Sequence, residues 1–73
     1  MVPITFADIG EEVTIRKITG KDEVRLHLAE MGFVVGEPVT LLAKNGENLI
    51  IKVKESRVAV GEGLANRIQI EGN

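Results

Sequence analysis

The sequence contains no cysteine, tryptophan or tyrosine, and Phe6 and Phe33 are its only aromatic residues. Without cysteine the chain can form neither a disulfide nor a thiolate metal site. Grooves that bind polyproline segments and surfaces that bind single-stranded nucleic acid are lined with aromatic rings, so both ligand classes are disfavoured. No apolar run approaches the roughly 20 residues of a membrane helix, and the first residues lack the pattern of a signal peptide. We therefore expect a soluble protein that does not itself insert into a membrane, and any connection to a membrane would come through a partner.

Charge and histidine content narrow the function further. The net charge of −2 argues against a nucleic-acid partner, because such binding depends on Lys and Arg neutralising phosphates. The local basic set Lys52, Lys54 and Arg57 is interpreted as a solvated strand surface. A single histidine and no cysteine leave no Ser-His-acid or Cys-His arrangement, and 61–63 is a bare Gly-x-Gly turn. We expect a non-enzymatic protein with no cofactor, formed by one domain over residues 1–73.

One segment has helical periodicity. Val24, Leu28 and Met31 are spaced i, i+4 and i+7, which places them on one apolar stripe. Thr19 or Asp22 can cap the start, and Gly32 is suited to close the end in a left-handed conformation. The pattern predicts a helix over about 22–31.

The rest of the chain alternates with the period of two that is typical of strands. The alternation of Val13 and Ile15 breaks before Ile18, which predicts either a bulge or a strand end near Lys17. Further on, the pattern places Val39, Leu41 and Ala43 on the core face of one strand and Thr40 and Lys44 on the other face. The remaining predictions are a hairpin turn at 45–48, a strand over 49–54, a tight turn at 55–56, a strand over 57–60, a 3₁₀-like turn near 61–66 and a last strand over 67–71.

These elements predict a mainly β fold. About five short strands with tight turns and one inserted helix fit a small β-barrel whose closure removes exposed sheet edges. The first ten residues are irregular, and we expect Phe6 and Ile9 to hold them against the core.

Three segments carry a family resemblance, which covers nearly the whole chain. They are Asp8-Ile9-Gly10, Leu28-x-x-Met31-Gly32-Phe33-x-x-Gly36, and Val58-Ala59-Val60-x-x-x-Leu64-Ala65-x-x-Ile68-x-Ile70. In these motifs and their order the chain resembles the FeoA family of small cytosolic proteins of bacterial ferrous iron uptake. The resemblance implies an SH3-like barrel that supports or regulates the membrane transporter FeoB through its cytosolic GTPase part. The chain departs from the family pattern at His27, where a basic residue is common, and at Val35, where proline is common.

Two alternative functions remain open. The same module is similar to the C-terminal SH3-like domain of iron-dependent repressors, so a repressor-associated interaction domain is an alternative. A small divalent-metal-binding protein is another, because Glu23, His27 and Glu30 share one side of the predicted helix at i, i+4 and i+7. The competing interpretation of these three residues, which we favour, is a solvated face in which the carboxylates offset a partly charged imidazole.

Several apolar residues fall outside the predicted core pattern. Leu26 lies roughly opposite the helix stripe, Leu42 and Ile50 alternate out of phase with their strands, and Phe33 adjoins a turn. Bent strands or a docked helix could bury them, whereas exposure would mark an interaction surface. Our hypothesis is that Leu26, His27, Phe33 and Leu42 contribute to a partner surface, with self-association left open.

Overall fold

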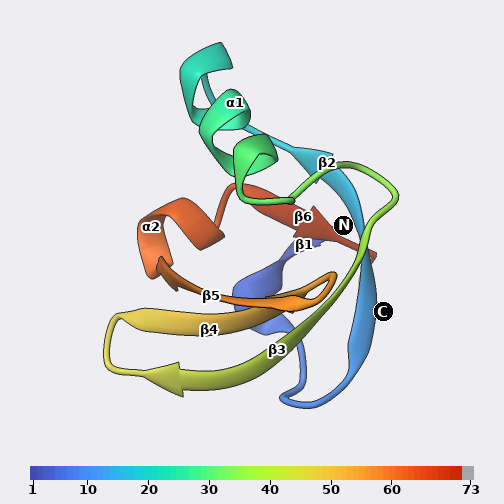
Figure 1. Cartoon of the computed structure of the whole chain (residues 1–73), viewed down its shortest axis with the longest axis vertical. Helices are drawn as coiled ribbons and strands as arrows, with labels where there is room; N and C mark the ends of the chain where they lie inside the picture. The colour runs from blue at the N-terminus through green and yellow to red at the C-terminus, as the bar shows by residue number, and fades with distance from the viewer. Residues whose placement is uncertain (72–73) are drawn as a thin grey trace.

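Six strands form one antiparallel sheet in the computed structural model, which describes residues 1–71 (Figure 1). In chain order the elements are β1 (Val2–Pro3), the 3₁₀ helix η1 (Ile4–Phe6), β2 (Glu12–Ile18), α1 (Asp22–Glu30), β3 (Pro38–Asn45), β4 (Asn48–Val53), β5 (Ser56–Gly61), α2 (Glu62–Ala65) and β6 (Ile68–Ile70).

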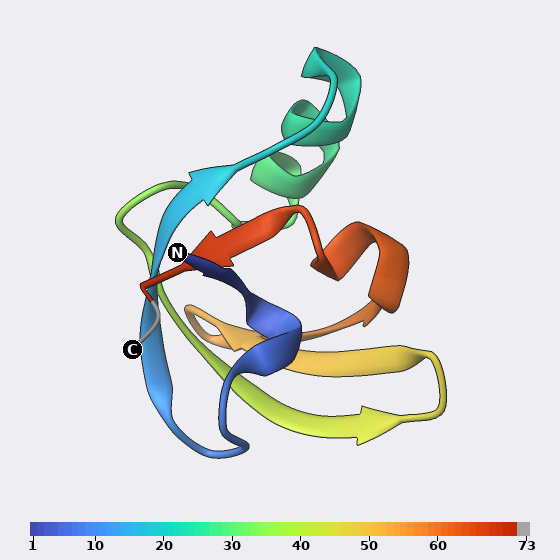
Figure 2. The same cartoon turned by 180° about the vertical axis from the view of Figure 1, so that it is seen from behind.

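The strand order is β1-β6-β2-β3-β4-β5, and the sheet curls strongly around its concave face (Figures 1 and 2). Val2 pairs with Ile70, so the first and last strands are neighbours. The edge strands β1 and β5 do not pair with each other, so the expectation of a closed barrel is wrong. The two-residue β1 includes Pro3, which has no amide N–H to donate to a further strand.

Of the two alternatives predicted near Lys17, the bulge is confirmed. Ile15 pairs with Ile70 and Lys17 with Gln69, so one extra residue is inserted in β2 between the two pairs. The insertion lets Ile15 be fully buried while Ile18 also packs against the core.

A second bulge, which was not predicted, lies in β3. Leu41 pairs with Ile51 and Ala43 with Ile50, so Leu42 is the extra residue. The predicted faces of Ala43 and Lys44 are therefore exchanged, because one inserted residue reverses the alternation that follows it. Ala43 shares the outer face with Ile50, and Lys44 pairs with Leu49 at the rim of the concave face.

The turns lie close to the predicted positions, but one is shifted by a residue and one has a different helix type. The hairpin at 45–48 is confirmed, with Gly46 at φ 64°. The next turn is centred on Lys54 and Glu55, one residue earlier than predicted, and Lys54 adopts φ 56°. Near 61–66 the chain forms a single α-helical turn, α2, rather than a 3₁₀ turn, and η1 supplies 3₁₀ geometry near the start instead.

Helix α1 begins without the predicted side-chain cap. Its N-cap is Lys21, and Thr19 instead bonds to the Arg67 carbonyl. Asp22 is already inside the helix, where its carboxylate accepts a hydrogen bond from Arg25 at 2.7 Å. Asp22 and Glu23 still suit the positive end of the helix dipole.

The end of α1 is as the sequence predicts. The Gly32 amide donates to the Ala29 carbonyl and the Phe33 amide to the Leu28 carbonyl, both at 2.9 Å. With Gly32 at φ 101°, these two bonds form a Schellman motif. The motif reverses the chain and places Leu28 and Phe33 together in the buried core cluster.

The core lies inside the curl of the sheet. Phe33 is its largest fully buried side chain. The other buried residues are Ile4, Ile15, Leu28, Val39, Leu41, Leu49, Ile51, Val53, Val60, Ala65, Ile68 and Ile70. Phe6 and Ile9 are 73% and 60% exposed, so their predicted role in the core is wrong. A 3₁₀ turn rotates about 120° per residue, and burial of Ile4 therefore points Phe6 away from the core.

We predict that Gly32→Ala lowers the melting temperature by several degrees. A Cβ at this position would lie 3.2 Å from Val53 Cγ2, and φ 101° is strained for any L side chain. Gly63→Ala is the matched control, because a Cβ there meets nothing within 4 Å and alanine favours the helical turn. Thermal unfolding followed by circular dichroism measures both variants, and equal melting temperatures would contradict the role given to Gly32.

Candidate interaction surface

Helix α1 stands at one end of the molecule, beyond the curled sheet, in both views (Figures 1 and 2). Leu28 is the residue of α1 that is fully buried, and Val24 packs partly against the core. Leu26 is 63% exposed and His27 is also exposed. Two of the predicted partner-binding residues are thus accessible on this helix.

Phe33 does not belong to this surface. It has no solvent exposure, because the Schellman motif turns the chain inward directly after the helix. The hypothesis that Phe33 contributes to an exposed patch is therefore wrong. The residues that follow it are accessible instead, with Val34 40% and Val35 63% exposed.

Leu42 lies apart from the helix. It is half-buried at the bulge of β3, and the β3–β4 hairpin lies at the end of the molecule opposite α1 in both views (Figures 1 and 2). Ile50 is also half-buried, on the outer face of the sheet. The fold therefore does not bring Leu26, Phe33 and Leu42 into one surface.

The three metal-ligand candidates are all exposed on α1. Glu23 and Glu30 are separated by about two helical turns, with His27 between them. Within residues 1–71 no group of three His, Asp or Glu side chains is placed to hold a metal ion. The interpretation of these exposed residues as a solvated helix face stays a prediction.

A second group of exposed apolar side chains lies near the start of the chain. Met1 is 70% exposed, and Phe6 and Ile9 are the other two members. The exposure of Phe6 has no signal in the sequence, because Val2, Ile4 and Phe6 alternate as the residues of a buried strand face would. Among the described residues, no helix is long and apolar enough to span a membrane.

Geometry and comparison agree on the class of protein. The curled antiparallel sheet with a helix inserted after β2 is an SH3-like fold, shared with FeoA of Stenotrophomonas maltophilia solved in complex with zinc and described as a prokaryotic SH3 domain protein. That structure is 25% identical, with a TM-score of 0.84 over 97% of this chain and 91% of the other.

The chain belongs to the FeoA family, because the family model described as the FeoA domain matches residues 2–72. It is 35% identical to the "Putative Fe(2+) transport protein A" of Methanocaldococcus jannaschii, over 97% of this chain and 87% of that protein. A crystal structure named iron uptake regulatory protein (FeoA) is 30% identical, with a TM-score of 0.87 over 94% of this chain and 93% of the other.

A manganese-dependent transcriptional repressor shares the fold alone. It is 15% identical, with a TM-score of 0.84 over 93% of this chain and 39% of that one.

We predict that Zn²⁺ or Fe²⁺ titrated into the purified protein shows no saturable binding tighter than millimolar. One imidazole and two separated, mobile carboxylates give a weak site without supporting groups. Isothermal titration calorimetry, under anaerobic conditions for Fe²⁺, measures this directly, with His27→Ala as the control. Tight binding by the unmodified chain that His27→Ala removes would restore the metal-site interpretation.

Proposed function

We propose that this chain is a small, cytoplasmic, non-enzymatic interaction module of ferrous iron uptake. Its partner in this proposal is FeoB, which it supports or regulates through the cytosolic GTPase part of that transporter. The observation that carries the proposal is the FeoA family match over residues 2–72.

The names of the relatives support the link to iron. The archaeal relative is named for Fe(2+) transport, and the 30% identical structure is named an iron uptake regulatory protein. The Stenotrophomonas protein is described as a candidate activating factor for ferrous iron transport. The likeness to the repressor extends to the fold alone at 15% identity, so the transport setting is preferred over the repressor-associated one.

The exposed surface of α1 supports an interaction role. Leu26 is 63% exposed on a helix that stands away from the sheet, and His27 lies beside it. Full burial of a leucine side chain contributes about 1.5–3 kcal/mol, which is about tenfold or more in affinity. In the proposed mechanism, docking of this helix biases FeoB between conformations, and the bias equals the difference in affinity for the two states.

The first test uses the purified chain and the cytosolic domain of FeoB. We expect saturable binding in calorimetry and a changed rate of GTP hydrolysis when the chain is added. The proposed function would be contradicted if the chain showed no binding and left the rate of GTP hydrolysis unchanged.

The second test locates the contact. Leu26→Glu should weaken FeoB binding by about tenfold or more, because it puts a charge where the leucine side chain would be buried in the complex. The melting temperature should not change, because Leu26 is exposed in the free chain. Ile9→Glu, at a residue of similar exposure on the N-terminal segment, is the matched control and should bind as the unmodified chain does. Equal binding by Leu26→Glu would move the contact away from α1.

A further inference from the structure

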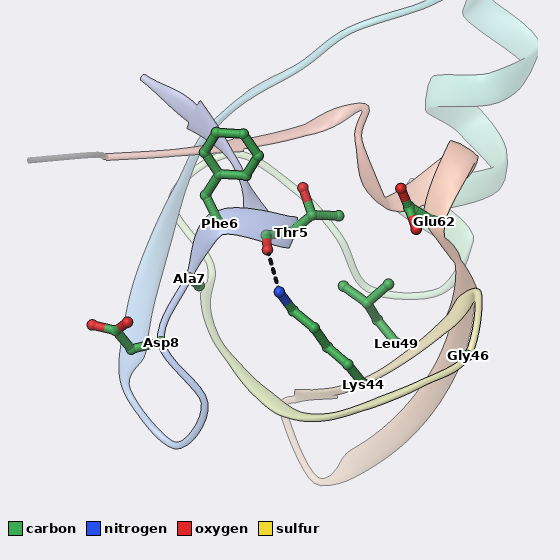
Figure 3. A pocket seen from close by; sticks show the side chains of 8 residues that line it. All are labelled: Thr5, Phe6, Ala7, Asp8, Lys44, Gly46, Leu49 and Glu62. Carbon is green, nitrogen blue, oxygen red and sulfur yellow. Dashed lines mark hydrogen bonds between the residues drawn. The ribbon is translucent and has the colours of Figure 1, made fainter.

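Phe6 is the most exposed large apolar side chain of the described residues, and it stands between two surface hollows. The larger hollow has a volume of about 570 Å³ and lies between η1 and the β3–β4 hairpin (Figure 3). The smaller, of about 270 Å³, lies between η1 and the ends of β2 and β6. Phe6, Ala7 and Asp8 line both, so the ring forms a ridge shared by two adjoining depressions.

The ridge is held in place by contacts from two other parts of the fold. The bulge at Leu42 brings Lys44 to the concave rim, where its Nζ donates a hydrogen bond of 2.8 Å to the Thr5 carbonyl (Figure 3). The Thr5 hydroxyl donates to Asn66 Oδ1 at 2.9 Å, directly after α2. The surface is therefore largely formed before any partner arrives, which lowers the ordering cost of binding.

Apolar groups line the base of each hollow. Leu49 lies in the larger one, pointing from β4 towards η1 in Figure 3, and Val13 and Ile70 lie in the smaller. A single exposed phenylalanine needs no explanation by itself. Phe6 is not isolated in this way, because a hollow with apolar lining lies on each side of its ring. A partner side chain that entered either hollow would therefore contact Phe6 as well.

The charge around the ridge is negative. The charged residues that line the two hollows are Asp8, Glu11, Lys44, Glu62 and Glu71. Glu71 is paired with Arg16 at 2.6 Å, and Lys44 is hydrogen-bonded to Thr5. Asp8, Glu11 and Glu62 make no ion pair within residues 1–71. Lys44 keeps its positive charge, because the Thr5 carbonyl is neutral, but the carboxylates outnumber it, so the surface combines an apolar ridge with a net negative charge.

We propose that the surface around Phe6 binds a basic segment of a partner protein. An apolar side chain of the segment packs beside the Phe6 ring, and its Lys or Arg side chains face Asp8, Glu11 and Glu62. A second copy of this chain is the poorer occupant, because a two-fold contact through the same patch would place these acids opposite one another. The inference does not rest on the proposed function and concerns a surface separate from α1.

The test uses the full chain, labelled with ¹⁵N, and a short synthetic peptide of alternating lysine and leucine with blocked ends. We expect fast-exchange amide shifts concentrated at residues 5–11 and 44–49, and weaker binding as salt rises. A lysine–serine peptide tests the apolar contribution, and a glutamate–leucine peptide tests the charge. Both should bind more weakly than the lysine–leucine peptide by about tenfold or more.

Phe6→Ser is the decisive variant, because its side chain is exposed and the core is unaltered. It should keep the circular dichroism spectrum and weaken binding of the lysine–leucine peptide by about tenfold. Val35→Ser is the matched control, with the same replacement at a 63% exposed apolar residue that lines neither hollow, and should bind the peptide as the unmodified chain does.

Four outcomes would overturn the proposal. They are no amide shift at millimolar peptide, shifts concentrated on α1, equal binding of the glutamate–leucine peptide, and unchanged binding by Phe6→Ser. Sedimentation of the unmodified chain as a dimer that Phe6→Ser dissociates would assign the surface to a second copy instead.

Discussion

The hydrogen bond from the Phe33 amide to the Leu28 carbonyl determines how the helix joins the sheet. It requires Gly32 at φ 101°, and it reverses the chain so that two large apolar side chains enter the same core. Leu28 is the one fully buried residue of this nine-residue helix, and the reversal adds the buried Phe33 ring to its attachment to the sheet. The position of α1, and with it the exposure of Leu26, follows from that turn.

Two inserted residues decide which side chains face the core along the sheet. The extra residue in β2 lets Ile15 and Ile18 both reach the core, and Leu42 in β3 moves Lys44 to the concave rim. From this rim Lys44 donates to the Thr5 carbonyl and lines the larger hollow beside Phe6. The surface around η1 thus depends on a residue inserted in β3, a strand that does not pair with β1.

The sequence predicts the elements that depend on local chemistry. The helix stripe of Val24, Leu28 and Met31, its glycine end and the turn at 45–48 are present as expected, because each needs neighbours within a few residues. The bulge in β3, the open sheet edge and the exposure of Phe6 were not predictable in this way. A period of two cannot reveal an inserted residue unless the pattern visibly breaks, and the run Leu41-Leu42-Ala43 is apolar throughout. The burial of Phe33 likewise depends on how α1 docks, which residue type alone does not specify, whereas the exposure of Leu26 agrees with its place opposite the helix stripe.

Pairing of Val2 with Ile70 has a consequence for how this fold is used in larger proteins. Because the first and last strands are adjacent, both connections to other polypeptide leave from nearly one point, and the remaining surface stays unobstructed. Such a unit can be appended to another domain, or inserted into a loop of one, without deforming its sheet. The likeness to a repressor in which the matching part is 39% of the chain fits this geometry. A host joined at this point would lie beside the smaller hollow at Phe6, whereas α1, at one end of the molecule, would remain clear of the junction.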